Sequence, residues 1–248
     1  MSILKEFNFQ NTYELADLID NLVKADVDFW NYNEELFIAS ATKFSKDTLL
    51  HLYIVTAALN HYRREYRKNG DLEDEETMEK WYSLFETHKI GVRKFIFDTE
   101  SELTEWFDEN LNHFEELFDK MADEVFYILF SNRKFLLDFN NLAAKRISET
   151  TFSSDWLTKK GTIKRTSIPK WVQTAVFHRD KGRCVFCFTD LTSLVNTLTN
   201  SNYDHIVPLD LFGTNDPCNI QLTCESCNKK KTNKEGITTN QYIPWWTR

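Results

Sequence analysis

Apolar residues recur at helical spacing through most of the first 150 residues of the chain. In residues 45–68, 99–118 and 121–139 they fall three or four positions apart, which places them on one face of an α-helix. Thr99, followed three residues later by Glu102, is typical of a capping box at the start of a helix. Proline, which would interrupt a helix, is absent from this part. We therefore predict an all-α N-terminal region of five to seven helices, with the very apolar residues 121–139 at its centre.

The pattern changes in the last third of the chain. Residues 202–208 alternate between polar and apolar positions, as a short strand does, and residues 219–222 can form a second strand. Residues 213–217 combine Gly, Asn, Asp and Pro, which is typical of a turn. Residues 225–234 predict a short helix that would bring Asn228 toward the first strand. The order strand, loop, strand, helix predicts a ββα unit, and the fold class of the whole chain is α+β.

One further helix is expected just before this unit. Residues 168–180 are amphipathic, and Pro169 stands in the first turn, where its fixed backbone angle is tolerated. Its apolar residues are expected to pack on the ββα unit; they are Trp171, Val172, Ala175 and Val176.

Composition and charge divide the chain at the same place as the pattern does. Of the 248 residues 42% are hydrophobic and 15% aromatic, which excludes a disordered chain. Residues 1–150 contain 17 Lys and Arg against 30 Asp and Glu, a net charge of −13, whereas residues 151–248 contain 13 against 8, a net charge of +5. All four prolines and all five cysteines lie in the second part. We expect an acidic helical domain over 1–150, regulatory or partner-binding, and a second domain over 151–248.

The chain shows no signal for a membrane or for export. No run of about 18 apolar residues is present, so we expect no transmembrane helix and no membrane partner. The first 20 residues lack a basic segment followed by an apolar stretch, as a secretory signal would have. The expected location is therefore the cytoplasm.

The cysteines predict a metal centre. Cys184 and Cys187 form one C-x-x-C pair and Cys224 and Cys227 another, and each spacing lets two thiolates reach one tetrahedral ion. In a cytosolic chain such pairs indicate zinc rather than disulfides. Four sulfurs complete the coordination of a structural zinc ion. Cys218 is expected to be an inert, partly buried thiol, the alternative being a fifth, exchangeable ligand.

Three segments together resemble a known family. They are residues 179–187 (RDKGRCVFC), residues 203–208 (YDHIVP) and residues 219–231 (NIQLTCESCNKKK). This combination resembles the HNH endonucleases of the zinc-stabilised ββα-metal class, over residues 167–235. Domains of this kind with a helical N-terminal region occur in bacterial restriction and phage-defence proteins, so the resemblance also implies a role in antiviral defence.

The resemblance implies a role for each polar residue of the motif. His205 would be the general base that activates water, for which an imidazole with a pKa near neutrality is suited. Asp204 and Asn228 would hold a catalytic divalent ion, Mg²⁺ or Mn²⁺, through oxygen atoms. Asn219 would be structural and fix the loop and the orientation of His205. The implied activity is hydrolysis of phosphodiester bonds in DNA.

The sequence also departs from the family pattern. Phe188 stands where many members have Gly after the first cysteine pair, and a single Gly213 replaces a frequent Gly pair. Residues 189–203 form an insertion to which we assign no role. The first two departures affect the shape of loops more than the chemistry of the site.

Charge indicates how nucleic acid would be bound. Lys229, Lys230, Lys231 and Arg183 are the candidate contacts to phosphate, which dominates nucleic-acid affinity; a solvated helix face is the alternative for the three lysines. The alternative to an endonuclease is a catalytically silent or partner-activated zinc-dependent module that binds nucleic acid. The helical region suits a protein partner or self-association. The tail, residues 241–248, is expected to dock on the domain or else to present its aromatic residues to a partner.

Overall fold

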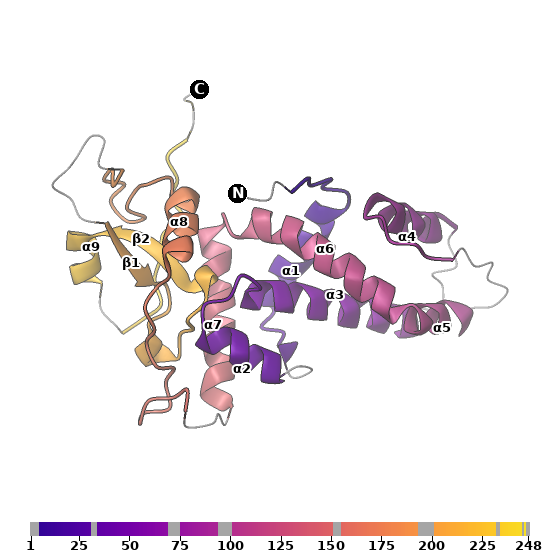
Figure 1. The fold of residues 1–248 in the computed structure, drawn as a ribbon, viewed down its shortest axis with the longest axis horizontal. Helices are drawn as coiled ribbons and strands as arrows, with labels where there is room; N and C mark the ends of the chain where they lie inside the picture. Colours follow the sequence, from indigo (N-terminus) through magenta and orange to yellow (C-terminus); the bar gives the residue numbers. More distant parts are fainter. Residues whose placement is uncertain are drawn as a thin grey trace. The chain divides into compact units, whose positions relative to one another are not determined.

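The computed structural model describes residues 5–30, 34–68, 75–93, 101–150, 155–192, 201–231, 234–244 and 246. The helices and strands in these ranges are α1 (Thr12–Lys24), α2 (Glu34–Thr42), α3 (Leu49–Lys68), α4 (Glu75–Thr87), α5 (Ser101–Glu109), α6 (Leu111–Leu129), α7 (Arg133–Glu149), α8 (Lys170–Arg179), β1 (Ser201–His205), β2 (Ile220–Cys224) and α9 (Glu225–Lys230), together with 3-10 helices at Leu209–Leu211 and Pro217–Asn219 (Figure 1). None of the described helices combines the length and apolar character needed to span a membrane.

The chain forms two compact units. The first, here called the helical unit, comprises Met1–Asn21 and His51–Tyr127; the second, the knuckle unit, comprises Leu22–Leu50 and Ile128–Arg248. These units do not follow the change of composition at residue 150, because α2 and α7 belong to the same compact unit as the cysteine pairs and the ββα motif.

An aromatic core holds the helical unit together. Phe114 on α6 is fully buried, and its ring centroid lies 4.2 Å from that of Phe107 and 5.1 Å from that of Trp81. Trp81 in turn packs edge-on against Tyr62 of α3 at 4.9 Å. These residues are the apolar positions of their helices, so burial of large aromatic surface, rather than a particular bond, drives this packing.

The helix expected at the centre is in fact divided. The described part of the chain contains seven helices before residue 150, within the expected number, but α6 ends at Leu129 and α7 begins at Arg133. A new helix begins after Asn132, because the Asn132 side chain accepts a hydrogen bond of 3.1 Å from the Phe135 N–H and so caps the start of α7. The predicted capping residue Thr99 lies outside the described residues, and α5 begins at Ser101.

The ββα motif of the knuckle unit is present in the predicted order. Strands β1 and β2 pair antiparallel, with Asp204 opposite Gln221 and His205 opposite Ile220, and α9 follows β2 directly. Helix α9 is shorter than the predicted 225–234, since Lys231 has an extended backbone. The α+β fold class, helices followed by a small ββα region, is therefore confirmed.

Helix α8 packs against β2 through two of its four expected residues. Val172 and Val176 are fully buried with Ile220 and Leu222 of β2. Trp171, in contrast, is 38% exposed, because it lies next to Val172 in sequence and a helix turns by about 100° per residue.

Buried polar side chains connect the segments of the knuckle unit. Asp216 accepts hydrogen bonds of 2.8 Å from the Leu49 N–H, at the start of α3, and from the Cys218 N–H. Asn140 on α7 donates to the Cys218 carbonyl at 3.0 Å. Asn215 donates to the carbonyl of Thr42 at 3.0 Å, at the end of α2. These bonds fix the loop between β1 and β2 to helices that lie far away in the sequence.

Candidate metal centre and nuclease site

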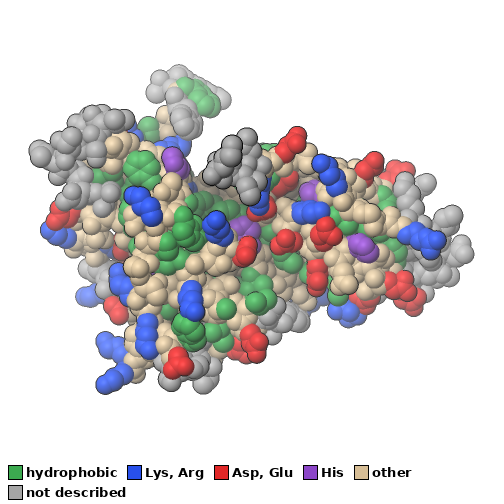
Figure 2. All heavy atoms as spheres, viewed as in Figure 1, with side chains coloured by type: hydrophobic (Ala, Val, Ile, Leu, Met, Phe, Trp, Pro, Cys, Tyr) green, Lys and Arg blue, Asp and Glu red, His purple; other side chains and the backbone are tan. Residues whose placement is uncertain are grey.

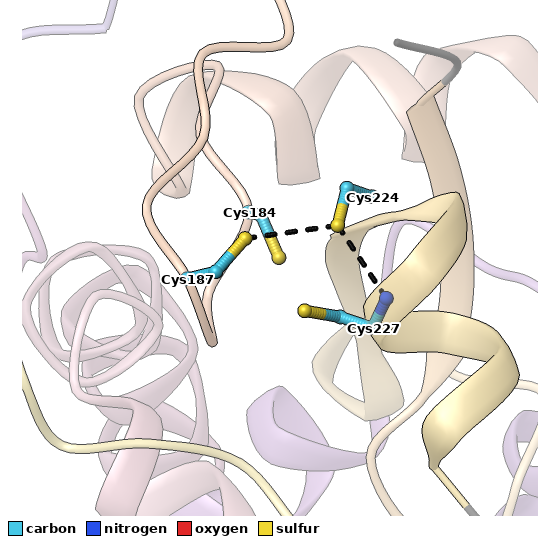
Figure 3. Close-up of side chains that lie close together, drawn as sticks. All are labelled: Cys184, Cys187, Cys224 and Cys227. Atoms are coloured by element: carbon cyan, nitrogen blue, oxygen red, sulfur yellow. Dashed lines mark hydrogen bonds between the residues drawn. The ribbon is translucent and has the colours of Figure 1, made fainter.

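The four predicted cysteines converge on one point. Their Sγ atoms all lie within 4.8 Å of one another, and the Sγ atoms of Cys187 and Cys224 are 3.6 Å apart. Tetrahedral coordination with Zn–S bonds of about 2.3 Å separates the sulfurs by about 3.8 Å. Figure 3 shows the four side chains pointing toward a common centre from two separate segments. The set of donors and their spacing therefore fit a zinc ion.

Two tight turns present these ligands. In the first, the Phe188 N–H donates to the Cys184 carbonyl at 2.9 Å, and Phe188 has a φ of 60°, the left-handed region that favours glycine. The departure from the family pattern at Phe188 thus puts a bulky residue in a strained backbone conformation. In the second, Cys224 ends β2 and caps α9, and the Cys227 N–H points to the Cys224 Sγ at 3.5 Å.

The surroundings of the sulfurs favour thiolates at two positions. Although burial opposes ionisation, hydrogen bonds from the Ser226 hydroxyl and the Cys227 N–H lower the pKa of Cys224 to about 6. The Thr189 hydroxyl, 3.1 Å from the Cys187 Sγ, likewise lowers the pKa of Cys187 against the effect of burial. Thiolates are the form in which cysteine binds metal.

Cys218 lies apart from this cluster. It is fully buried, and its Sγ lies 3.9 Å from the Thr48 hydroxyl. Burial, together with the nearby Asp216 carboxyl, raises the pKa of Cys218, which keeps the thiol protonated. These are the properties expected of an inert thiol, with more complete burial than predicted.

The imidazole of His205 is enclosed at the end of β1. The residue is 2% exposed, and its Nε2 has no hydrogen-bond partner among the described residues. Burial, followed by the positive charge of Arg165, lowers the pKa of His205 to about 4, against the opposing effect of Asp204. The imidazole is therefore neutral near pH 7, and its pKa lies well below the near-neutral value expected from the sequence, which makes it a weaker proton acceptor than expected.

Asp204 points away from His205 and meets a lysine. Its side chain is 23% exposed, and its Oδ2 accepts a hydrogen bond of 2.6 Å from Lys231 and one of 3.3 Å from Gln221. Its Oδ1 makes no hydrogen bond with a described residue. Asn228 lies on α9, one helical turn before Lys231, and its amide also makes no hydrogen bond within the described part of the chain. Two oxygen donors suited to a hard cation are thus left open on neighbouring elements.

Asn219 forms the base of the loop that carries His205. Its Oδ1 accepts from the Val207 N–H at 2.8 Å, and its Nδ2 donates at 3.0 Å to the carbonyls of Val207 and Thr214. The loop is so tight that a Cβ at Gly213 would lie 2.0 Å from the Val207 carbonyl oxygen. Close approach of the backbone therefore requires glycine at this position.

The predicted phosphate contacts differ in exposure. Lys229 and Lys230 are exposed on α9, although Lys229 also pairs with Glu225, and Arg183 is partly exposed beside Asp190. Lys231 is different: its side chain is 5% exposed, and it donates to Asp204 and to the carbonyls of His205 and Ile206. Its ammonium is thus engaged inside the protein instead of facing a DNA phosphate. Figure 2 shows Lys and Arg side chains spread over one face of the knuckle unit.

Sequence reasoning missed the environment of the site. The positive charge of Arg165 acts on His205 although the two residues lie 40 positions apart in the sequence. The contact of Lys231 with Asp204 depends on the fold of α9 against β1. No local pattern signals either interaction.

The fold places four cysteines that can hold a metal ion beside a ββα motif. Residues 192–234 match the model of the HNH endonuclease family, which confirms the resemblance seen in the sequence. The match covers the ββα motif, the second cysteine pair and all four polar residues of the motif. Comparison with curated proteins and with solved structures gives no match.

Proposed function

We propose that this protein is a metal-dependent endonuclease that hydrolyses phosphodiester bonds in DNA. The observation that carries the proposal is the match of residues 192–234 to the HNH endonuclease family, because this segment contains Asp204, His205, Asn219 and Asn228. The cysteine centre supports it, since it holds the loop before β1 to the end of β2.

His205 is the general base of the proposed reaction. Its depressed pKa keeps the imidazole neutral, and the free Nε2 can take the proton of a water molecule as the water attacks phosphorus. Asn219 contributes indirectly, because its three hydrogen bonds fix the loop after β1 and thereby the position of His205. Asp204 and Asn228 are the residues that would hold Mg²⁺ or Mn²⁺. When bound, such an ion supplies positive charge that stabilises the negative charge developing on the phosphate.

Basic residues around this site would bind the DNA backbone. The positive charge of exposed Arg165 acts on His205, so we assign Arg165 a role in attracting the phosphate toward the base. Lys229 and Lys230 are exposed on α9 and extend the positive surface. Phosphate contacts of this kind give affinity without reading sequence.

Cleavage of supercoiled plasmid by the zinc-loaded protein tests the activity. We expect nicking or linearisation that requires added Mg²⁺ or Mn²⁺ and that falls by at least about a hundredfold in His205→Ala, the scale on which general bases contribute. His178→Ala, at an exposed histidine of α8, is the matched control and should cleave as the wild type does. Zinc content is measured in every variant, so that loss of the ion is not mistaken for loss of the base. Cleavage that persists unchanged in His205→Ala would contradict the proposal.

One observation favours a second candidate, a nuclease that becomes active only with a partner. His205 is enclosed, and the Lys231 ammonium already neutralises Asp204, so a rearrangement would have to precede binding of a metal ion. A wild type that binds DNA in a gel-shift assay but cleaves nothing, with zinc bound, would support this candidate over the first. In that case the helical region, within residues 1–150, is where a protein partner or a second copy would bind.

As its setting we propose defence against phage or foreign DNA in the cytoplasm of a bacterium. The support is the likeness in domain arrangement to restriction and phage-defence proteins, which is an argument by analogy. Plaque counts on cells expressing the wild type or His205→Ala test it. Equal plaque numbers on both would contradict a defence role that depends on cleavage.

A further inference from the structure

A cavity of the knuckle unit lies apart from the polar residues of the ββα motif. It has a volume of about 530 Å³ and is lined by the start of α7, the end of α8, the loop of the first cysteine pair and residues 242–244. None of Asp204, His205, Asn219 and Asn228 is among its lining residues. Its volume is within the range of cavities that bind small molecules.

Two buried guanidinium groups in this cavity share one carboxylate. The side chains of Arg179 and Asp180 are each 1% exposed, and Nη2 of Arg179 lies 2.8 Å from Oδ2 of Asp180. Arg133, on α7, is 6% exposed, and its Nη1 lies 3.9 Å from Oδ1 of the same carboxylate. Asp180 also accepts the Leu222 N–H at 2.9 Å. One carboxylate therefore compensates two buried guanidinium groups. This leaves one positive charge without a counter-charge, which costs free energy in the interior of a protein.

The hydrogen bonds of these groups are also incomplete. Arg179 donates through Nη2 to the Ile220 carbonyl at 2.7 Å, but its Nη1 is buried and has no acceptor among the described residues. Arg133 donates from Nε to the Thr239 carbonyl and from Nη2 to the Gln241 carbonyl, and neither acceptor brings a charge. Burial lowers the pKa of Arg133, and the charge of Arg179 acts in the same direction. The shared carboxylate and the open Nη1 of Arg179 together leave positive charge and a donor that an anion can use.

The rim of the cavity adds more positive charge. Lys181 and Arg183 line it together with the two buried arginines, and Lys181 also interacts with a further group of the protein. Arg183 has a further carboxylate, that of Asp190, at 3.7 Å outside the lining. The Tyr242 ring lies 4.1 Å from the Arg133 guanidinium, and the Tyr242 hydroxyl accepts the backbone N–H of Arg133 and donates to the Ser131 carbonyl. The tail thus docks here and holds Arg133 in place.

We propose that this cavity binds a phosphate group, with Arg179, Arg133, Lys181 and Arg183 as its cationic ligands. Guanidinium groups suit phosphate because their planar N–H groups match pairs of phosphate oxygens. The group can belong to a free phosphate or small phosphate ester, or to the backbone of bound DNA. In either case the site is separate from the one at which cleavage is proposed.

Isothermal titration calorimetry on the zinc-loaded full chain, without other divalent ions, tests the site. Pyrophosphate and inorganic phosphate are the probes, in a chloride buffer. We expect saturable binding by the wild type that is at least about tenfold weaker in the double variant Lys181→Gln, Arg183→Gln. The matched control is Lys160→Gln, at an exposed lysine of the same unit that does not line the cavity, and it should bind as the wild type does.

A competing short DNA duplex distinguishes the two sources. Displacement of pyrophosphate by the duplex identifies the backbone of DNA as the ligand, whereas simultaneous binding of both identifies a free phosphate compound. Arg179→Met is a second variant and should abolish binding; because it can also disturb folding, its circular dichroism spectrum is compared with that of the wild type. No saturable binding by the wild type, or equal affinity in the folded double variant, would overturn the proposal. The readout involves no cleavage, so its failure leaves the proposed endonuclease activity untouched.

Discussion

The two compact units differ in what holds their interiors together. In the helical unit, rings such as Phe107, Phe114 and Phe118 are buried against one another, and apolar area provides the stabilisation. In the knuckle unit, Asn215, Asp216 and Asn219 are as deeply buried as those rings, and each is held by hydrogen bonds. Non-directional packing tolerates change in detail, whereas a buried polar group depends on particular partners.

The difference matches the chemistry proposed for each unit. A general base must be held in one orientation, and buried amides that bond to loop carbonyls provide this constraint. A unit that serves only to bind a partner has no such requirement, because its surface, rather than its interior, carries the function. The following changes test whether the comparison holds, beginning with the largest effect.

Loss of one zinc ligand should disrupt the knuckle unit alone. Cys227→Ser removes one of four thiolates, and structural zinc binding contributes on the order of 10 kcal/mol to the folding of small zinc domains. We expect bound zinc to fall below about a tenth of the wild-type content, and the knuckle unit to become sensitive to protease while the helical unit resists. Cys218→Ala, at the cysteine outside the cluster, is the control and should retain zinc. Full zinc content in Cys227→Ser would refute the assigned ligand set.

Replacing a buried amide by an apolar residue should lower the unfolding free energy far more than exchanging one buried apolar residue for another. Asn219→Leu keeps the volume similar but leaves one N–H and two carbonyls without partners, so we expect a loss of about 4 kcal/mol of unfolding free energy. Leu117→Met, at a fully buried position of α6, should lose less than about 1.5 kcal/mol. Urea denaturation followed by circular dichroism measures both. Similar losses of unfolding free energy in the two variants would contradict the view that the knuckle unit depends on specific polar bonds and the helical unit on apolar packing.

The buried carboxyl of Asp216 should make stability depend on pH. Burial raises its pKa from 3.8 to about 6, so the native state binds a proton more tightly than the unfolded state between these values. This contribution is present in full below pH 3.8 and is lost as the pH rises through 6. Between pH 4 and pH 7, the stability of the wild type relative to Asp216→Asn should fall by up to about 3 kcal/mol, since one pKa unit corresponds to about 1.4 kcal/mol.

Denaturation at several pH values measures this difference, and subtraction of the variant removes the effects of other titrating groups. Asp17→Asn, at an exposed carboxyl of the helical unit, is the control for loss of a negative charge. A difference between wild type and Asp216→Asn that stays constant over this range would show that the carboxyl titrates as it does in the unfolded chain.

Local sequence patterns predicted the elements of both units better than their connections. The cysteine spacing predicted the metal centre because two residues between thiols suffice to bring them to one ion. Helical periodicity predicted the helical unit because its core is built from one face of each helix. It did not show the break between α6 and α7, because Phe130 continues the apolar spacing while the cap of Asn132 depends on a single side chain.

The polar framework of the knuckle unit was beyond prediction from the sequence. The partners of Asp216 and Asn215 at Leu49 and Thr42 lie 167 and 173 residues away, and nothing near either residue marks them as a pair. Lys231 was placed with its neighbours as a phosphate contact because composition does not show which lysine of a run turns inward. These positions depend on the folded structure as a whole.

The knuckle unit is made of residues 22–50 and 128–248, which are separated in the sequence by residues 51–127 of the helical unit, and this has a consequence for its synthesis. Chains emerge from the ribosome N-terminus first, and domains generally fold as they become complete. The Thr42 carbonyl of α2 and the Leu49 N–H of α3 therefore have no Asn215 or Asp216 to bond with until most of the chain has been synthesised. A ribosome that stalls before residue 215 would release a chain that contains His205 but lacks Cys224, Cys227 and Asn228, so it could assemble neither the four-cysteine centre nor the site proposed for cleavage.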